Sequence, residues 1–348
     1  MTGAGETSGV ARPASFAGIR RAVVPGFAIG VALFTILVAR QGVGELFAAL
    51  SVEGWGLLGV ALFHLAPMLA DTIGWRTVLP PSVRPGLGSV LFARWIGESV
   101  NTLLPAMQVG GNLAKADVLA HRGVGGMIAG ASVVVDVTLV MLSQIVFTVV
   151  GLFLLLAHAD GRHLAPAAAV GLGLSLLGLA GFVVAQRFGL FAAGARLFAR
   201  LRRRDGGTLA EGAAALDDVV ADLYRARGRV LTAWLYHFTS WVVRVGEVWL
   251  ALRLLGHPVD FLAATILESL AQAIRGAAFA VPGALGIQEG GLLLLGTTLG
   301  MAPDTALALS LTKRVREITL GLPGLVAWQL DWTSRRGATK SPGAGKET

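Results

Sequence analysis

An apolar stretch with a break in its middle constrains this chain more than any other feature. Residues 268–300 are apolar enough for a lipid bilayer, yet Pro282, Gly283 and Gly286 interrupt them. Proline removes a backbone donor and glycine loosens a helix, so the break exposes backbone polar groups. Hydrocarbon cannot satisfy such groups, so the break must be buried in protein or line a wet cavity. Many transporters build a binding site from a broken helical hairpin of this kind.

The amino-acid composition is typical of a membrane protein. Of its 348 residues, 54% are hydrophobic and only 14% are charged. This predicts an all-α, polytopic integral membrane protein without a large soluble domain. Because the chain has no cysteine, disulfides and thiolate metal sites are excluded, and we expect neither a metal nor a cofactor. The net charge of +8 indicates orientation and contact with anionic lipid rather than nucleic acid.

Hydropathy along the chain predicts about six full transmembrane helices and two broken re-entrant hairpins. The hairpins cover about residues 90–122, broken near Pro105, and residues 259–300. A count of eight spans, in which both hairpins cross the membrane, preserves the same sidedness and stays open. The six spans are expected at 24–38, 55–75, 125–158, 164–186, 230–255 and 302–330.

Lysine and arginine cluster in segments that this arrangement places on one side of the membrane. By the positive-inside rule that side is cytoplasmic, and both chain ends lie there. We expect a single membrane domain at 22–333, flanked by disordered cytoplasmic segments at 1–21 and 334–348. The basic clusters lie at 12–21, 76–94, 187–229 and 335–346.

The longest polar loop, residues 187–229, has the pattern of two amphipathic helices. Leucines at positions 190, 197 and 201 lie beside arginines, which is typical of a helix resting on anionic lipid. Two solvated helices without a partner explain the pattern equally well. A second apolar stripe with acids opposite follows at Leu209, Leu216, Val220 and Leu223.

The two hairpins have a similar spacing of their key residues. Pro105 precedes Asp136 by 31 residues, and Pro282 precedes Lys313 by the same number. With one hairpin opening from inside and the other from outside, this spacing indicates an inverted repeat, on which alternating access is commonly built. A coincidence of proline and glycine spacing is the alternative.

Charged residues inside the apolar segments are candidates for function, because each one costs free energy in a bilayer. Glu268, Gln272 and Arg275 share one helical face of the second hairpin. The last span carries a charged stripe that includes Lys313, Arg314 and Glu317. Two glycines, Gly321 and Gly324, follow it and permit close helix contact.

We predict that these groups form a cluster near the second break. It would contain four basic and three acidic side chains, a positive surplus suited to a phosphate headgroup. Alternatively, the charges form an internal salt-bridge network that touches no ligand. The predicted substrate-binding residues of this half are Glu268, Arg275, Pro282, Gly283, Gly286, Gln288, Glu289, Lys313, Arg314, Arg316 and Glu317.

The first hairpin contains a second candidate anion site. Gly110 and Gly111 precede a short helix that we predict to begin near Asn112, whose free amides would face the break, with Lys115 one turn further on. Glu98 and Asn101, upstream of these glycines, either close this pocket or only cap it. The predicted substrate-binding residues of this half are Glu98, Asn101, Gln108, Gly110, Gly111, Asn112 and Lys115.

Three further polar residues, His64, Asp71 and Asp136, could form a proton path. The alternative is that they are hydrogen-bonded polar residues between helices. His237 lies between Tyr236 and Phe238, and we interpret it as a packing or interface residue. No zinc-ligand spacing, Walker loop or nucleophile elbow is present, which argues against ATP-driven transport by this chain alone. Intramembrane catalysis on a lipid stays open.

Three segments resemble a known family. They are RWIGESVNTLLPAMQVGGNLAKADVLAHRG (94–123), AAFAVPGALGIQEGGLLLLG (277–296) and KRVRE (313–317). They resemble the flippase-like transmembrane domain of lysylphosphatidylglycerol synthases, over roughly residues 20–332. Within that superfamily they are most similar to the stand-alone bacterial proteins associated with hopanoid biosynthesis (the HpnL type). The resemblance implies an inner-membrane protein that flips or handles a lipid. The residues after Trp332 are too few for the soluble aminoacyl-transferase domain, so we expect no lipid aminoacylation.

The favoured hypothesis is lipid translocation or lipid handling, with a polar headgroup held between the hairpins. The rival hypotheses are a membrane-embedded enzyme, an accessory subunit of hopanoid or lipid biosynthesis, and a scaffold without transport. The expected partners are phospholipids or hopanoid-type lipids, and either lipid-biosynthesis proteins or a second copy of the chain.

Overall fold

The computed structural model describes residues 55–104, 109–157, 165–187, 206–277 and 287–339. In these ranges the chain is helical and has no strand, which confirms the predicted all-α class. The predicted first span and the first amphipathic helix of the polar loop lie outside the described residues. So do the tips of both hairpins, with Gln108, Pro282, Gly283 and Gly286.

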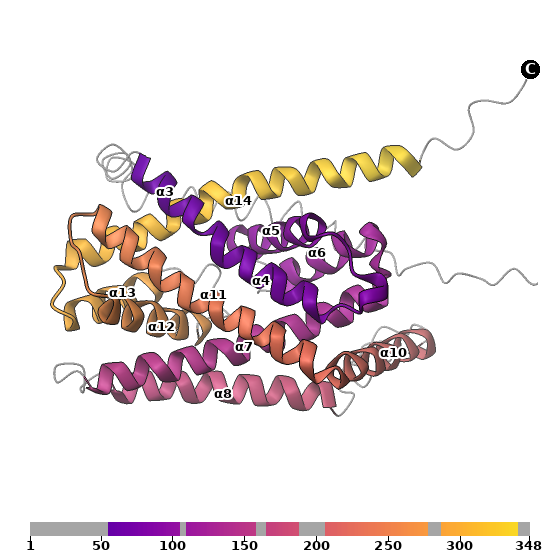
Figure 1. Cartoon of the computed structure of the whole chain (residues 1–348), viewed down its shortest axis with the longest axis horizontal. Coiled ribbons are helices and arrows are strands. Elements are labelled where there is room, and N and C mark those ends of the chain that lie inside the picture. The colour runs from indigo at the N-terminus through magenta and orange to yellow at the C-terminus, as the bar shows by residue number, and fades with distance from the viewer. Residues whose placement is uncertain (1–54, 105–108, 158–164, 188–205, 278–286, 340–348) are drawn as a thin grey trace, which may run out of the picture.

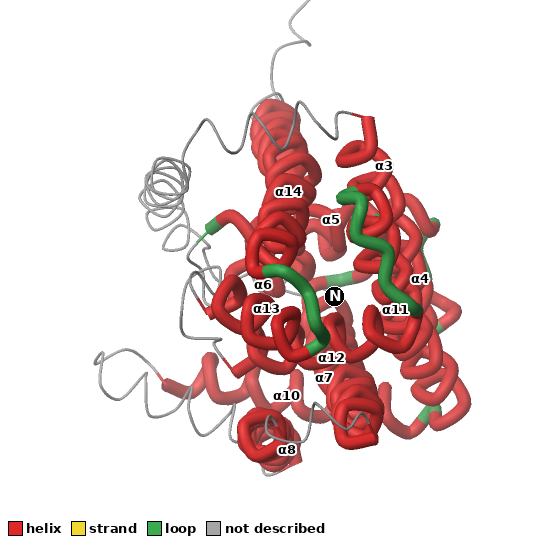
Figure 2. Tube along the Cα trace, turned by 90° about the vertical axis from the view of Figure 1, so that its left-hand side faces the viewer, coloured by secondary structure: helices red, strands yellow, loops and turns green. Residues whose placement is uncertain are grey.

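The helices form one elongated bundle. Figure 1 shows α14 along one side and α8 along the opposite side, with α4, α5, α6 and α11 between them, and the end view in Figure 2 shows the same order. The helices are α3 (Trp55–Phe63), α4 (Leu65–Val78), α5 (Leu87–Leu103), α6 (Val109–Leu119), α7 (Gly126–Ala157), α8 (Ala165–Arg187), α10 (Gly206–Arg225), α11 (Arg227–Leu254), α12 (Phe261–Ala277), α13 (Ile287–Thr298) and α14 (Pro303–Thr339).

Among the described residues, two helical segments are by themselves long and apolar enough to cross a membrane, Gly56–Val78 and Gly126–Ala157. The first comprises α3 and α4, which are separated at His64 because Pro67 cannot donate to the carbonyl four residues earlier. The segments predicted at 164–186, 230–255 and 302–330 are helical, and their placement in the membrane stays a prediction.

The last helix runs further than the sequence predicted. The helix α14 continues to Thr339, so residues 334–339 are helical rather than disordered. Arg335 explains the extension, because its guanidinium pairs with Asp331 on its own helix and with Asp117 of α6, at 3.1 Å from Oδ2. These pairs fix the end of α14 against the first hairpin.

Each predicted hairpin consists of two helices that pack on each other, α5 with α6 and α12 with α13. Between α5 and α6 the backbones approach closely at two glycines. A Cβ on Gly111 would overlap the carbonyl oxygen of Gly97, and the Gly111 amide donates to Asn101 Oδ1 at 2.9 Å. The re-entrant path and the inverted repeat remain predictions.

Replacing Gly111 with leucine is expected to separate α5 from α6, because the new side chain would collide with the backbone carbonyl of Gly97 as well as with the Asn101 side chain. Overpacking of this kind costs about 1–3 kcal/mol or more. The measurement is the loss of folded protein on heating in detergent. The matched control is Gly88→Leu in α5, where a Cβ meets nothing within 4 Å. Equal melting of the two variants would show that the two helices are not packed this closely.

Helix α14 packs across α5 through the two glycines that the sequence singled out. A Cβ on Gly321 would lie 2.6 Å from Leu103 Cδ1, and one on Gly324 would overlap the Ser99 hydroxyl. Trp95 of α5 donates its indole N–H to the carbonyl of Leu320 at 2.8 Å. The predicted role of these glycines in close helix contact is therefore confirmed.

The second amphipathic helix of the polar loop is α10. Val220 and Leu223 on its apolar face are buried against Ala131 and Val135 of α7. This part of the loop therefore has a protein partner, and the alternative of two solvated helices without a partner is wrong for α10. Contact of the loop with anionic lipid stays a prediction for residues 187–205.

Candidate functional site

The interior of the bundle contains two connected clusters of charged side chains. The first, the Asp136 cluster, is centred on an aspartate of α7 that is fully buried. Arg94 of α5 donates to Asp136 Oδ1 at 2.6 Å, and Lys115 of α6 donates to Oδ2 at 2.8 Å. Both cations also lie over the ring of Trp75, at 5.6 Å and 5.1 Å from its centroid. One carboxylate thus ties both helices of the first hairpin to α7.

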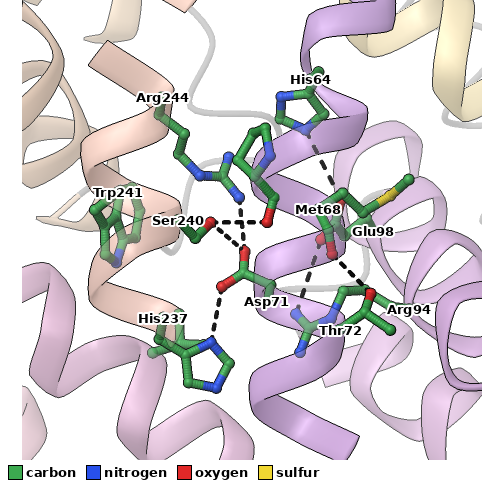
Figure 3. Close-up of polar contacts among 12 residues, drawn as sticks. His64, Met68, Asp71, Thr72, Arg94, Glu98, His237, Ser240, Trp241 and Arg244 are labelled. Carbon is green, nitrogen blue, oxygen red and sulfur yellow. Dashed lines mark hydrogen bonds and ion pairs between the residues drawn. The ribbon is translucent and has the colours of Figure 1, made fainter. Parts of the chain in front are cut away.

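Asp71 of α4 belongs to the same cluster through a histidine. His237 of α11 places Nδ1 at 2.8 Å from Asp71 Oδ1 and Nε2 at 3.2 Å from Asp136 Oδ1. Arg244, two helical turns further along α11, donates to Asp71 Oδ2 at 3.0 Å, and the Ser240 hydroxyl lies 2.8 Å from the same oxygen (Figure 3). The interpretation of His237 as a packing residue is therefore wrong, because both ring nitrogens face carboxylates.

The second group, the Glu317 cluster, lies among α11, α12, α13 and α14. Glu317 accepts from Arg275 at 2.6 Å and from Arg314 at 3.0 Å. Arg314 also donates to Glu289 Oε1 at 3.0 Å. Lys313 pairs with Glu268, which accepts from the Gln272 amide as well. The charged side chains predicted to gather near the second break do gather, and they are Glu268, Arg275, Glu289, Lys313, Arg314, Arg316 and Glu317.

Glu247 of α11 is a member of this cluster that the sequence reasoning missed. It pairs with Arg316 and lies 2.7 Å from His64 Nδ1. With Glu247 included, the described cluster has four basic and four acidic groups, so the predicted positive surplus is wrong. The signal was present in the sequence: His237, Ser240, Arg244 and Glu247 follow one another at helical spacing and form one polar face of α11.

Glu98 lies between the two clusters. Its carboxylate is 3.9 Å from Arg94 Nη1 and 4.0 Å from His64 Nε2, and its side chain is 31% exposed (Figure 3). The other carboxylates in these contacts are far less exposed, 13% at most. Glu98 is thus the accessible acid of a network whose other acids are held tightly.

The predicted anion site at the first hairpin is not arranged as expected. Helix α6 begins at Val109 rather than near Asn112, so Gly110 and Gly111 lie in its first turn. The Gly111 amide is bound to Asn101, and Lys115 is bound to Asp136. Both groups have protein partners because α5 and α7 pack directly against this helix.

Of the three predicted proton-path residues, two come together and one does not. Asp71 and Asp136 are joined by His237, whereas His64 lies with Glu247 and Arg316. In the second hairpin, Gln288 is buried and neither atom of its side-chain amide has a hydrogen-bond partner. In the part of the chain that is described, no group of three or more His, Asp or Glu side chains could hold a metal ion.

The comparison with protein families decides the identity of the bundle. The family described as the lysylphosphatidylglycerol synthase TM region matches residues 23–324, which is most of the chain. The chain belongs to this family. Membership in the lysylphosphatidylglycerol synthase TM-region family makes it a membrane protein with a lipid-related role. No curated protein and no solved structure matches the chain.

Proposed function

We propose that this chain translocates or otherwise handles lipids in the bacterial cytoplasmic membrane, with an anionic headgroup held beside the buried charges. The observation that carries the proposal is the network itself, found inside a family of lipid-related membrane domains. Charges inside a bilayer are expensive and commonly mark a substrate pathway. A network needed for stability alone could be replaced by apolar packing at little cost.

The contacts around Glu98 suggest where a headgroup would bind. Arg94 makes a tight pair with Asp136 at 2.6 Å, but its contact with Glu98 is long and partly exposed. A phosphate oxygen could replace the Glu98 carboxylate beside Arg94 without disturbing any buried pair. Guanidinium groups suit phosphate because they present several donors in one plane.

Several finer features belong to the same proposal. We place both chain ends in the cytoplasm, in accordance with the basic loops. We propose a link to hopanoid or anionic lipid metabolism, from the resemblance of the hairpin segments. Two broken hairpins related by an inverted repeat would let the site open to either side.

A membrane-embedded enzyme, or an accessory subunit of lipid biosynthesis, is the alternative function. The partly exposed Glu98 beside His64 favours it as a specific observation, since a carboxylate and an imidazole are common acid–base groups. Under the favoured proposal the lipid leaves chemically unchanged, whereas under the alternative it is converted.

The test is to reconstitute the purified chain in vesicles with labelled phospholipids and hopanoid-type lipids. Movement between leaflets without chemical change supports translocation, with protein-free vesicles as the control. Conversion of a lipid supports the enzyme. If neither occurs and a lipid-synthesising enzyme co-purifies, the accessory role is supported and translocation is refuted.

A further inference from the structure

His237 lies at the centre of the Asp136 cluster and contacts two carboxylates rather than one. Its side chain is fully buried, and its two ring nitrogens face two different helices, Asp71 of α4 and Asp136 of α7. In the described part of the chain, no other acidic side chain lies within ion-pair distance of its ring. These two acids also form ion pairs with three cations, Arg244 of α11, Arg94 of α5 and Lys115 of α6.

The number of protons on the ring decides whether both contacts can be made. A neutral imidazole has one N–H and one lone pair, whereas the imidazolium has two N–H groups. Only the imidazolium can donate to both carboxylates at once. In the neutral form one ring nitrogen turns its lone pair toward a carboxylate oxygen, and that contact becomes repulsive. The ring therefore joins α4 to α7 when it is protonated and releases one of them when it is not.

The geometry indicates which contact is released. Nδ1 makes a hydrogen bond of 2.8 Å with Asp71, whereas Nε2 lies 3.2 Å from Asp136 Oδ1 without an aligned hydrogen bond. The proton on Nε2 is thus the one held by the weaker contact. Its loss leaves Nδ1–H on Asp71 and frees Asp136, which still has Arg94 and Lys115.

The charge balance around the ring links this proton to an anion. With a neutral ring, the cluster contains three cations (Arg94, Lys115, Arg244) and three acids (Asp71, Asp136, Glu98). Protonation of His237 adds one positive charge. A net charge in a bilayer is costly, so the protonated ring and one bound phosphate anion favour each other.

We propose that His237 takes up one proton with each anionic phosphate group that binds beside the Asp136 cluster, so that lipid movement is coupled to the proton gradient. This inference rests on the function proposed above and names its energy source. The proton binds at Nε2 from the side on which the anion binds and leaves with it on the other side. The N–H bond at Nε2 forms in the first step and breaks in the second, and the lipid itself is chemically unchanged.

A binding measurement tests the linkage without transport. Phosphatidylglycerol is titrated into the purified full chain in neutral detergent, by calorimetry in two buffers that differ in ionisation enthalpy. We expect uptake of about one proton per anion bound, because linkage makes proton and anion binding reciprocal. Inorganic phosphate is titrated separately: uptake with both shows that the phosphate group suffices, and uptake with the lipid alone assigns the headgroup. Both results support the inference, and binding without proton uptake contradicts it.

The matched variants are His237→Asn and His121→Asn. Asparagine can still donate to Asp71 from near the position of Nδ1, but it cannot take up a proton, so we expect proton uptake to vanish. His121 is exposed and bonds the Asp117 carbonyl, so its variant should behave as the wild type. If His237→Asn does not fold, His237→Gln replaces it. Undiminished uptake in the folded variant overturns the assignment to His237.

Transport in vesicles then separates this inference from the proposed function. With one proton per lipid, a gradient of about one pH unit should sustain an about tenfold ratio of labelled phosphatidylglycerol between leaflets. His237→Asn should move lipid only toward an equal distribution. Wild-type movement that ignores the gradient contradicts the coupling but leaves the proposed function intact. Absence of movement for every lipid contradicts both.

Discussion

Asp136→Asn is expected to lower the free energy of unfolding by about 3–5 kcal/mol, because it leaves buried cations without their counter-charge. Arg94 and Lys115 are both buried, and their shortest ion pairs are with this carboxylate. An asparagine keeps the shape of the side chain but offers one neutral oxygen to two positive groups. The measurement is the unfolding of the purified protein in mixed micelles, followed by tryptophan fluorescence.

The control for this prediction is Asp222→Asn at a surface ion pair. Asp222 pairs with Arg225 on α10, and both side chains are largely exposed. Such a pair contributes less than about 1 kcal/mol, so this variant should unfold like the wild type. If Asp136→Asn were equally harmless, the two cations would have to reach water or another acid, and the Asp136 cluster as described would be wrong.

Lys313→Met is expected to cost about 3–5 kcal/mol, and the double variant Glu268→Met with Lys313→Met should regain most of it. The reason is that, among the described residues, the single change leaves the buried Glu268 carboxylate with the Gln272 amide as its remaining hydrogen-bond donor. The double change removes both charges and fills the space with apolar side chains. A double-mutant cycle on unfolding measures the coupling between the two positions.

The double variant also separates stability from function. We expect it to fold but to move lipid poorly. The ion pair joins the second hairpin to α14 and can open and re-form, whereas apolar packing at the same place would hold the two helices together permanently. Additive effects of the two single changes, with no recovery in the double variant, would show that Lys313 and Glu268 do not interact.

The sequence predicted the helices well because apolar periodicity is a local property. The segments expected at 125–158, 164–186 and 230–255 differ from the observed helices by at most three residues at either end. The end of α14 was missed because long-range pairs decide it, in particular that of Arg335 with Asp117. Composition alone indicated a polar tail there.

The candidate site was predicted in part for the same reason. Helical spacing brought the charges of the last span onto one face, and they do meet the second hairpin. The partner of a buried charge, in contrast, depends on packing between distant segments. Lys115 pairs with Asp136, 21 residues away, and Arg316 pairs with Glu247, 69 residues away. No local pattern indicates such pairs, so Lys115 was taken for a free cation and the pairing of Arg316 with Glu247 was not predicted.

The measurement that tests the central claim most directly is lipid movement in vesicles by the wild type and Arg94→Gln. Asp136 keeps Lys115 and His237 as partners in this variant, so we expect it to fold. Loss of a charge-assisted hydrogen bond to a headgroup, worth about 1.5–3 kcal/mol, should slow movement about ten- to a hundredfold.

The control is Arg253→Ala, at an exposed position near the end of α11. It should move lipid at the wild-type rate when equal amounts of folded protein are compared. Folded Arg94→Gln that moves lipid as fast as the wild type would contradict the claim that the buried charges handle the headgroup, and would leave them a purely structural role.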